Sequence, residues 1–312
     1  MAEGNPKTFL AGAALVWRWQ RLVWWIFVLS MVLGSYATKR MVDRAEPTLD
    51  HSLQSAPRLV HSFDLTAIAE LSNQPDSPLE GPGHAGLHFS VIYMVFMLFA
   101  TGGILVAYYR DERPTTGAFF EACGYHFWRF FRLLLYFALA LIPTAILASI
   151  VRAVYSRIAE KSISPMPSVY FFCAAAVVIL FLLIVTRLWF DMAQVIAVAE
   201  DEKKMRRALK ISAGLLRRHF GSLFWLYFRI SLIAWIIFGL GVYVWSHNLP
   251  PESTTTAFVL GQLVILSWIG TRLWQRASEA LWYREYKETT VVPPAYSPAP
   301  EPSPATYATA MN

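Results

Sequence analysis

Residues 169–189 read VYFFCAAAVVILFLLIVTRLW, an apolar run that closes with an arginine and a tryptophan. A helix needs about 20 predominantly apolar residues to cross the hydrocarbon core of a bilayer, and this run is nearly that long before its arginine. The tetrapeptide Thr-Arg-Leu-Trp occurs again at 271–274, where it closes another apolar run. Two runs of this kind, each placing a charge at the membrane edge, predict a protein built from transmembrane helices.

The composition of the whole chain points to the same class. Of its 312 residues, 56% are hydrophobic and only 15% are charged, whereas a soluble domain carries about 25% charged residues. The first and last of the candidate spans are short, and flanking tryptophans and arginines complete them. We therefore predict an all-α, polytopic membrane protein with six transmembrane helices, at Leu22–Ala37, Leu87–Tyr109, Leu133–Val151, Val169–Thr186, Phe220–Trp245 and Ala257–Thr271.

The distribution of basic residues predicts the orientation, because cytoplasmic flanks carry an excess of Lys and Arg. Of the 27 Lys and Arg residues, 19 lie on one side of the predicted spans, seven lie on the other side, and Arg229 lies within a span. Both termini are therefore predicted to be cytoplasmic, in a protein of the cytoplasmic membrane. Lys39 and Arg40, directly after the first span, run against this pattern. In this topology Cys123 and Cys173 face opposite sides, which excludes a disulfide.

Three parts follow along the chain: a cytoplasmic segment 1–21, a six-span membrane domain 22–288, and a Pro-rich cytoplasmic tail 289–312. The first span has no A-x-A cleavage signature behind it, which favours an uncleaved anchor over a signal peptide. The outer loop 38–86 predicts one or two short amphipathic helices. The tail is rich in Pro, Ala and Ser and predicts disorder.

Two connections between spans, 115–134 and 200–224, both resemble amphipathic helices. In the second, apolar residues share one helical face and basic residues share the other. Such a pattern is typical of an interfacial helix in the headgroup plane, so we predict two cytoplasmic interfacial helices. The second is expected to contact anionic lipid through Lys203, Lys204, Arg206, Arg207, Lys210, Arg217 and Arg218.

These connections also suggest an internal repeat. Aligning Ala118 with Ala208, an offset of 90, pairs Gly124 with Gly214, and the two TRLW copies are 85 residues apart. The shared order of span, amphipathic helix and span favours a duplication. Chance similarity in a chain rich in Leu and Trp stays open as the alternative.

Residues 187–224, RLWFDMAQVIAVAEDEKKMRRALKISAGLLRRHFGSLF, resemble the core of a broad group of six-span bacterial membrane proteins. That group includes the membrane domain found beside glycerophosphoryl diester phosphodiesterases, and several domains of unknown function. In it a span ends in an arginine, an acidic turn follows, and an A-L-x-x-S helix leads into the next span. Here Arg187, Glu200–Asp201 and 208–212 fill those places. Outside 187–224 the likeness is one of span count, and the phosphodiesterase activity is not implied, because no such domain accompanies these residues.

Charges inside the spans are candidate site residues, since a charge at mid-bilayer costs roughly 2.5–3.5 kcal/mol on insertion scales. Arg187 and Asp191 are one helical turn apart, and Arg229 lies inside the fifth span. We expect Asp191 to neutralise Arg187 along its helix or Arg229 across an interface. This polar cluster either pins two helices together or forms a site for an anionic headgroup or solute. Arg272 and Arg276 are expected to snorkel as anchors at the inner interface.

Catalytic motifs are missing from the sequence. It contains no G-x-x-x-x-G-K-[ST], G-x-S-x-G, H-E-x-x-H or C-x-x-C, and no span pairs two acids or an acid with a histidine. His84 and His88 have the i, i+4 spacing of two metal ligands, but no glutamate completes a zincin arrangement. The sequence therefore predicts no enzyme, no metal, no cofactor and no nucleic-acid partner.

The functional prediction is a non-enzymatic membrane scaffold or lipid-associated assembly factor, with anionic lipid and a membrane protein as its partners. The basic amphipathic helix and the Pro-rich tail favour it. The alternative is a transporter of a small solute or lipid, favoured by the repeat and the intramembrane charges. Transporters usually break their helices near the midplane, and only Pro143 and Gly239–Gly241 offer such a break.

Overall fold

The computed structural model describes residues 6–50, 84–161, 166–248 and 254–290, all of them in or between α-helices. Five described helices contain a segment long and apolar enough to cross a membrane, at Ser90–Arg110, Thr116–Ile158, Met166–Ala199, Met205–Trp245 and Thr255–Thr290. The prediction of an all-α chain with several membrane spans is therefore confirmed. The helices are α1 (Pro6–Arg18), α2 (Gln20–Asp50), α5 (His84–Arg110), α6 (Thr116–Lys161), α7 (Met166–Ala199), α8 (Met205–Asn248) and α9 (Thr254–Thr290).

The first predicted span, Leu22–Ala37, lies in α2, which is not among those five helices. Six spans therefore stay a prediction. The helices predicted for the outer loop fall mostly on 51–83, and the disordered tail falls on 291–312, both outside the described residues. The side chains of His84 and His88 are outside them as well.

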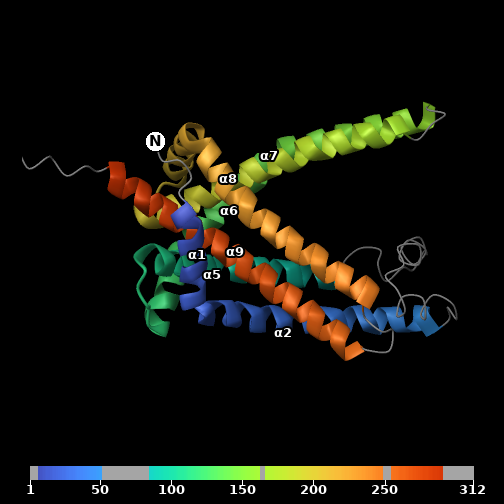
Figure 1. The fold of residues 1–312 in the computed structure, drawn as a ribbon, viewed down its shortest axis with the longest axis horizontal. Helices are drawn as coiled ribbons and strands as arrows, with labels where there is room; N and C mark the ends of the chain where they lie inside the picture. Colours follow the sequence, from blue (N-terminus) through green and yellow to red (C-terminus); the bar gives the residue numbers. More distant parts are fainter. Residues whose placement is uncertain (1–5, 51–83, 162–165, 249–253, 291–312) are drawn as a thin grey trace, which may run out of the picture.

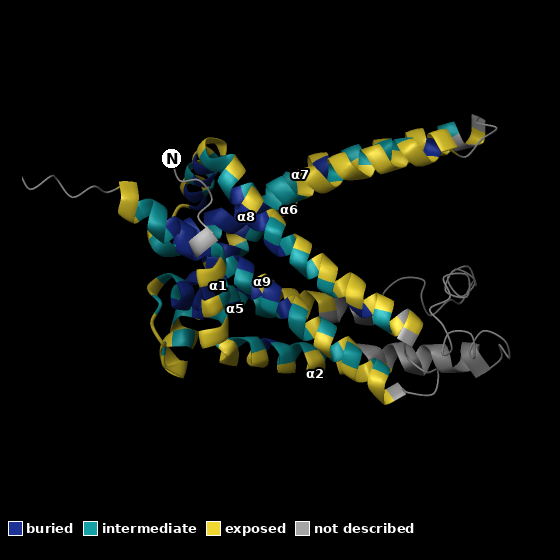
Figure 2. Cartoon of the chain, viewed as in Figure 1, coloured by how far each residue is buried: buried dark blue, intermediate teal, exposed yellow. Residues whose placement is uncertain are grey.

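Several helices are much longer than a bilayer requires. At about 1.5 Å per residue, the 34 residues of α7 extend for roughly 51 Å, against a hydrocarbon core of about 30 Å. The surplus lengths gather at one end of the bundle, which we call the base: α1, the start of α6, the end of α7, the start of α8 and the end of α9 (Figure 1). Buried residues concentrate there, whereas α6 and α7 leave the base together as an arm with an exposed apolar surface (Figure 2). An arm of this kind suits lipid as its surroundings.

The two amphipathic segments need correction. The first is continuous with the span of α6, and the second is set off from the rest of α8 only by a kink at His219, where φ is −123° and ψ is 28°. In α8 the apolar face of the segment is covered by protein, since Met205, Ala208 and Leu215 are buried. In α6 it is covered only in part, since Cys123 and Phe130 are buried while Phe120 and Trp128 are more than half exposed. The apolar face of the second segment is therefore not free for lipid, and two interfacial helices stay a prediction.

The packing at the base has a quasi-threefold pattern. Helices α5, α7 and α9 contact one another, and α2, α6 and α8 each contact two of them. Helix α2 packs on α5 and α9, α6 packs on α5 and α7, and α8 packs on α7 and α9. Among the described helices, α5, α7 and α9 thus form an inner ring with α2, α6 and α8 around it, and α1 packs on α9.

The sequence repeat matches this ring. Asp111 and Asp201 follow the ends of α5 and α7, at the offset of 90, and both have positive φ (57° and 48°), which Asp tolerates better than most residues. Each also forms an ion pair with an arginine, Arg18 for the first and Arg129 for the second. The same offset aligns α5 with α7, and the offset of 85 aligns α7 with α9.

The tryptophans of the two TRLW copies play equivalent structural roles. Trp189 Nε1 donates a hydrogen bond to the Leu209 carbonyl oxygen of α8 (2.9 Å), and Trp274 Nε1 donates one to the Phe9 carbonyl oxygen of α1 (2.8 Å). Helix α1 lies so close to α9 that a Cβ on Gly12 would stand 2.1 Å from Ser278 Oγ. The segment expected only as a cytoplasmic leader therefore holds a helix packed into the base.

Candidate functional site

A buried carboxylate lies between two arginines at the base. Asp191 Oδ1 is 3.0 Å from Arg276 Nη2 of α9, and Asp191 Oδ2 is 3.5 Å from Arg187 Nε on its own helix. The Asp191 side chain is 7% exposed, whereas those of Arg276 and Arg187 are 20% and 33% exposed. Asp191 therefore joins α7 to α9 and compensates part of the positive charge gathered there.

The structure brings together only part of the predicted cluster. Arg187 and Asp191 meet, but Arg229 lies over the Trp225 ring, with its Cζ atom 5.0 Å from the ring centroid. Arg276 is the partner that sequence reasoning missed. Arg276 was expected as an anchor at the inner interface, and in the structure it is mostly buried and pairs with Asp191. The sequence held one signal for this pairing: the TRLW offset of 85 places Arg276 on α9 at the position equivalent to Asp191 on α7.

A cavity of about 480 Å³ opens beside this cluster. Residues equivalent under the repeat line it on all three inner helices: Met97 and Thr101 on α5, Arg187 and Asp191 on α7, Arg272 and Arg276 on α9. Only the α7 and α9 members carry charge, so the cavity is polar on one side. The rest of the lining is mostly apolar and includes Ile26 of α2 and Leu133, Leu134 and Phe137 of α6.

Several polar atoms around the cavity are buried and have no hydrogen-bond partner in the described structure. They include Arg276 Nη1, Gln194 Oε1 and Asp191 Oδ2. Behind the wall, the buried Glu279 accepts a hydrogen bond from Gln275 Nε2 (3.1 Å) through Oε1, while its Oε2 is unpartnered. Because buried polar groups are normally paired, this concentration marks the cavity as the candidate functional site.

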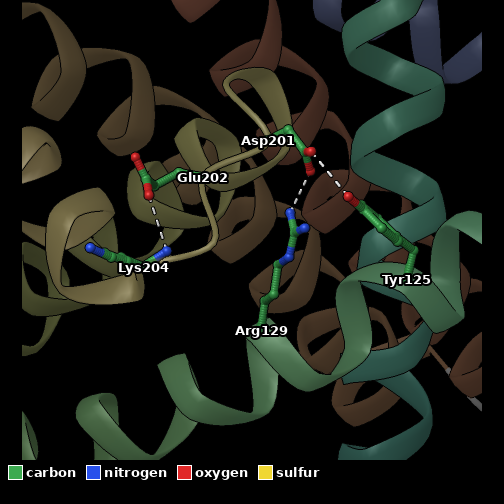
Figure 3. A network of polar contacts seen from close by, with 5 residues as sticks. All are labelled: Tyr125, Arg129, Asp201, Glu202 and Lys204. Atoms are coloured by element: carbon green, nitrogen blue, oxygen red, sulfur yellow. Dashed lines mark hydrogen bonds and ion pairs between the residues drawn. The ribbon is translucent and has the colours of Figure 1, made fainter.

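The acidic turn between α7 and α8 ties three helices together (Figure 3). Asp201 accepts hydrogen bonds from Arg129 and from Tyr125 (3.0 Å) of α6. The hydrogen bond from Arg129 lowers the pKa of the Asp201 carboxyl below its ordinary value. One residue further on, Glu202 Oε1 accepts a bond from the Lys204 backbone N–H (3.1 Å), where α8 begins.

The remaining residues of the resemblance motif also have structural partners. Glu200 accepts a hydrogen bond from Tyr283 (2.7 Å) of α9. Ser212 is fully buried and donates to the Trp189 carbonyl oxygen (2.7 Å), which fixes the start of α8 against α7. The residues of the motif from 187 to 224 therefore stabilise the packing of α7 against α8.

The basic face of residues 203–218 lies at the surface. Two of its residues have protein partners: Arg206 donates a hydrogen bond to Tyr136 (3.1 Å), and Arg207 forms an ion pair with Glu202 (3.4 Å). All seven basic residues of 203–218 are exposed, while the opposite face of the same segment is buried against the protein. Within the described chain, no group of three His, Cys, Asp or Glu side chains could hold a metal ion. Cys123 is buried, Cys173 is exposed, and both are free thiols.

The length and hydropathy of the helices define a multi-pass membrane protein, and its bundle holds an open, largely apolar cavity with charged residues on one side. No family model, curated protein or solved structure matches the chain. The resemblance to six-span bacterial proteins therefore stays a prediction.

Proposed function

We propose that the protein is a non-enzymatic scaffold of the cytoplasmic membrane, with six spans and both termini inside, that associates with anionic lipid at the cytoplasmic face. The observation that carries the proposal is the basic face of residues 203–218, where two exposed cations just before α8 and five on α8 stand on a segment whose other face is fixed to the base. A segment held in this way presents its charge to headgroups without inserting into them. We also propose a membrane protein as a second partner.

The energetics favour lipid association over a merely solvated face. Each basic side chain near an anionic leaflet contributes roughly 1 kcal/mol, within a Debye length of about 10 Å at 0.1 M salt. The seven contributions do not add fully, because the charges repel one another and some point towards water. Even a partial sum enriches anionic lipid around this end of the bundle.

The test uses the full-length protein, extracted from membranes together with its surrounding lipid. We expect the retained lipid to be enriched in anionic species and the enrichment to fall as salt rises. Replacing Arg206, Arg207, Arg217 and Arg218 with Gln should abolish it. A matched control replaces the exposed Arg152 and Arg157, at the far end of α6, with Gln. Unchanged lipid composition in the α8 variant would contradict the proposal.

A transporter of a small solute or lipid is the second candidate, and the cavity is the observation that favours it. The continuity of the helices argues against transport. Helix α6 runs unbroken through Pro143, and α8 departs from helical geometry at His219, near the base, and not at Gly239 or Gly241. Flux measured across proteoliposomes separates the two, since a scaffold produces none.

A further inference from the structure

We infer that the cavity between α5, α6, α7 and α9 binds one anionic lipid with a small phosphate headgroup. Arg187, Arg272 and Arg276 hold the phosphate, and an acyl chain lies along the apolar wall of α5. This inference goes beyond the proposed function, because it does not involve the basic face of α8.

The lining changes from apolar to charged along the cavity, as a lipid changes from acyl chain to phosphate. At one end it presents Tyr93, Met94 and Trp268, and at the other, nearer the base, it presents the arginines and Gln194. On α5 the lining extends from Tyr93 to Ile104, which corresponds to about 16 Å of helix. That is about half of the roughly 30 Å hydrocarbon core, the depth of one leaflet.

The arginines lie at the depth of the headgroups. Counted from Val169, about 20 residues of α7 fill the hydrocarbon core, which brings its edge to the neighbourhood of Arg187. The second TRLW copy places Arg272 at the equivalent position of α9. A lipid of this leaflet therefore has its phosphate beside the arginines and its chain beside the apolar wall.

The charge of the site calls for an anion. Three arginines and one aspartate line the cavity, so positive charge exceeds negative by two, and still by one if the buried Glu279 is counted as ionised. Arg276 Nη1 is buried without a partner, and Arg272 has no ion pair within the described part of the chain. Phosphate oxygens accept several hydrogen bonds from guanidinium groups and would satisfy these donors.

The cavity has the size and the opening that a lipid needs. Its volume of about 480 Å³ falls within the range of roughly 300–1,000 Å³ typical of ligand sites. At the end of the cavity that would hold the acyl chain, the side chains of Met94 and Trp268 remain 43% and 42% exposed. An acyl chain therefore has a lateral path from the bilayer into the cavity.

The experiment is native mass spectrometry of the full-length protein in detergent with added lipid. We expect one phosphatidic acid to be retained per chain, and phosphatidylcholine with the same acyl chains to be retained far less. Arg272→Gln should weaken phosphatidic acid binding about tenfold or more, while leaving no buried group unpaired. Met97→Trp should weaken it by filling the cavity without altering a charge. Arg229→Gln is the matched control, because that arginine lies outside the lining.

Three outcomes would overturn the inference. The first is equal retention of the two lipids, and the second is equal phosphatidic acid binding by the wild type and the Arg272→Gln variant. The third is displacement of the lipid by inorganic phosphate at equal concentration, which would show that the acyl chain contributes nothing to binding. The α8 variant lacking four arginines should keep this lipid, so failure of the scaffold proposal is distinguishable from failure of the cavity site.

Discussion

Replacing Asp191 with Ala tests the junction between α7 and α9. The change removes the carboxylate that compensates Arg276 at 3.0 Å and Arg187 at 3.5 Å. Breaking a buried ion pair on one side costs roughly 3–5 kcal/mol, because the remaining charge stays buried without a partner. The longer contact to Arg187 adds little, since that side chain is one-third exposed. We therefore expect a loss of about 3 kcal/mol, at the lower end of that range.

A double-mutant cycle separates this pairing from a general packing defect. Asp191→Asn keeps the shape of the side chain and should cost about half as much as Asp191→Ala. Combined with Arg276→Gln, it should be less damaging than the sum of the single changes by about 1–3 kcal/mol. The control pair, Asp191→Asn with Arg229→Gln, should be additive, because those side chains do not meet in the structure.

Thermal unfolding in detergent and in lipid is the assay, followed by intrinsic fluorescence. A loss of about 3 kcal/mol corresponds to a fall in Tm of several degrees, on the order of 5 °C or more. Wild-type Tm for Asp191→Ala in both media would refute the reasoning. So would strict additivity of Asp191→Asn and Arg276→Gln.

The Arg129–Asp201 pair predicts a pH dependence. Because the pKa of Asp201 is lowered in the folded state, its contribution is present above the unfolded pKa, about 4, and is lost as pH falls through the folded value. The side chain is 57% exposed, so Asp201→Asn should cost less than about 1 kcal/mol at pH 7, and its Tm should converge on that of the wild type below about pH 4. A difference in Tm that is constant with pH would contradict this. The proposed topology predicts that a membrane-impermeant thiol reagent on intact cells modifies a Ser156→Cys variant and not a Glu112→Cys variant, both without the native cysteines; the opposite pattern would reverse the orientation.

All six predicted spans fall inside helices of the structure, five of them in helices long and apolar enough to cross a membrane, but the helices run further than the spans. The sequence indicated Val169–Thr186 as a span, and α7 continues to Ala199. Residues beyond Arg187 lie in the base, where Leu188, Met192 and Ile196 are buried by protein. Hydropathy does not distinguish these two apolar surroundings, so the sequence could not place the boundary between lipid and protein.

Helix α1 and the pairing of Asp191 were missed for different reasons. The 13 residues of α1 are too few to cross a bilayer, so its apolar residues gave no span signal, and its stability comes from contact with α9. For Asp191, the sequence supplied two candidate cations, Arg187 and Arg229. The repeat also aligns Asp191 with Arg276, but the sequence does not show that these two equivalent positions face each other. The quasi-threefold ring brings them together.

The sequence by itself determined that the chain is a multi-pass membrane protein, which basic residues cluster together, and where the two TRLW arginines close their apolar runs. These properties are local, since transfer to a bilayer depends on the apolar residues of one segment at a time. Only the tertiary structure decided that the apolar face of α8 is covered by protein, that Arg276 and not Arg229 compensates Asp191, and that both TRLW arginines line one cavity. Those outcomes depend on which helices become neighbours, and that is set by packing among segments far apart in the chain.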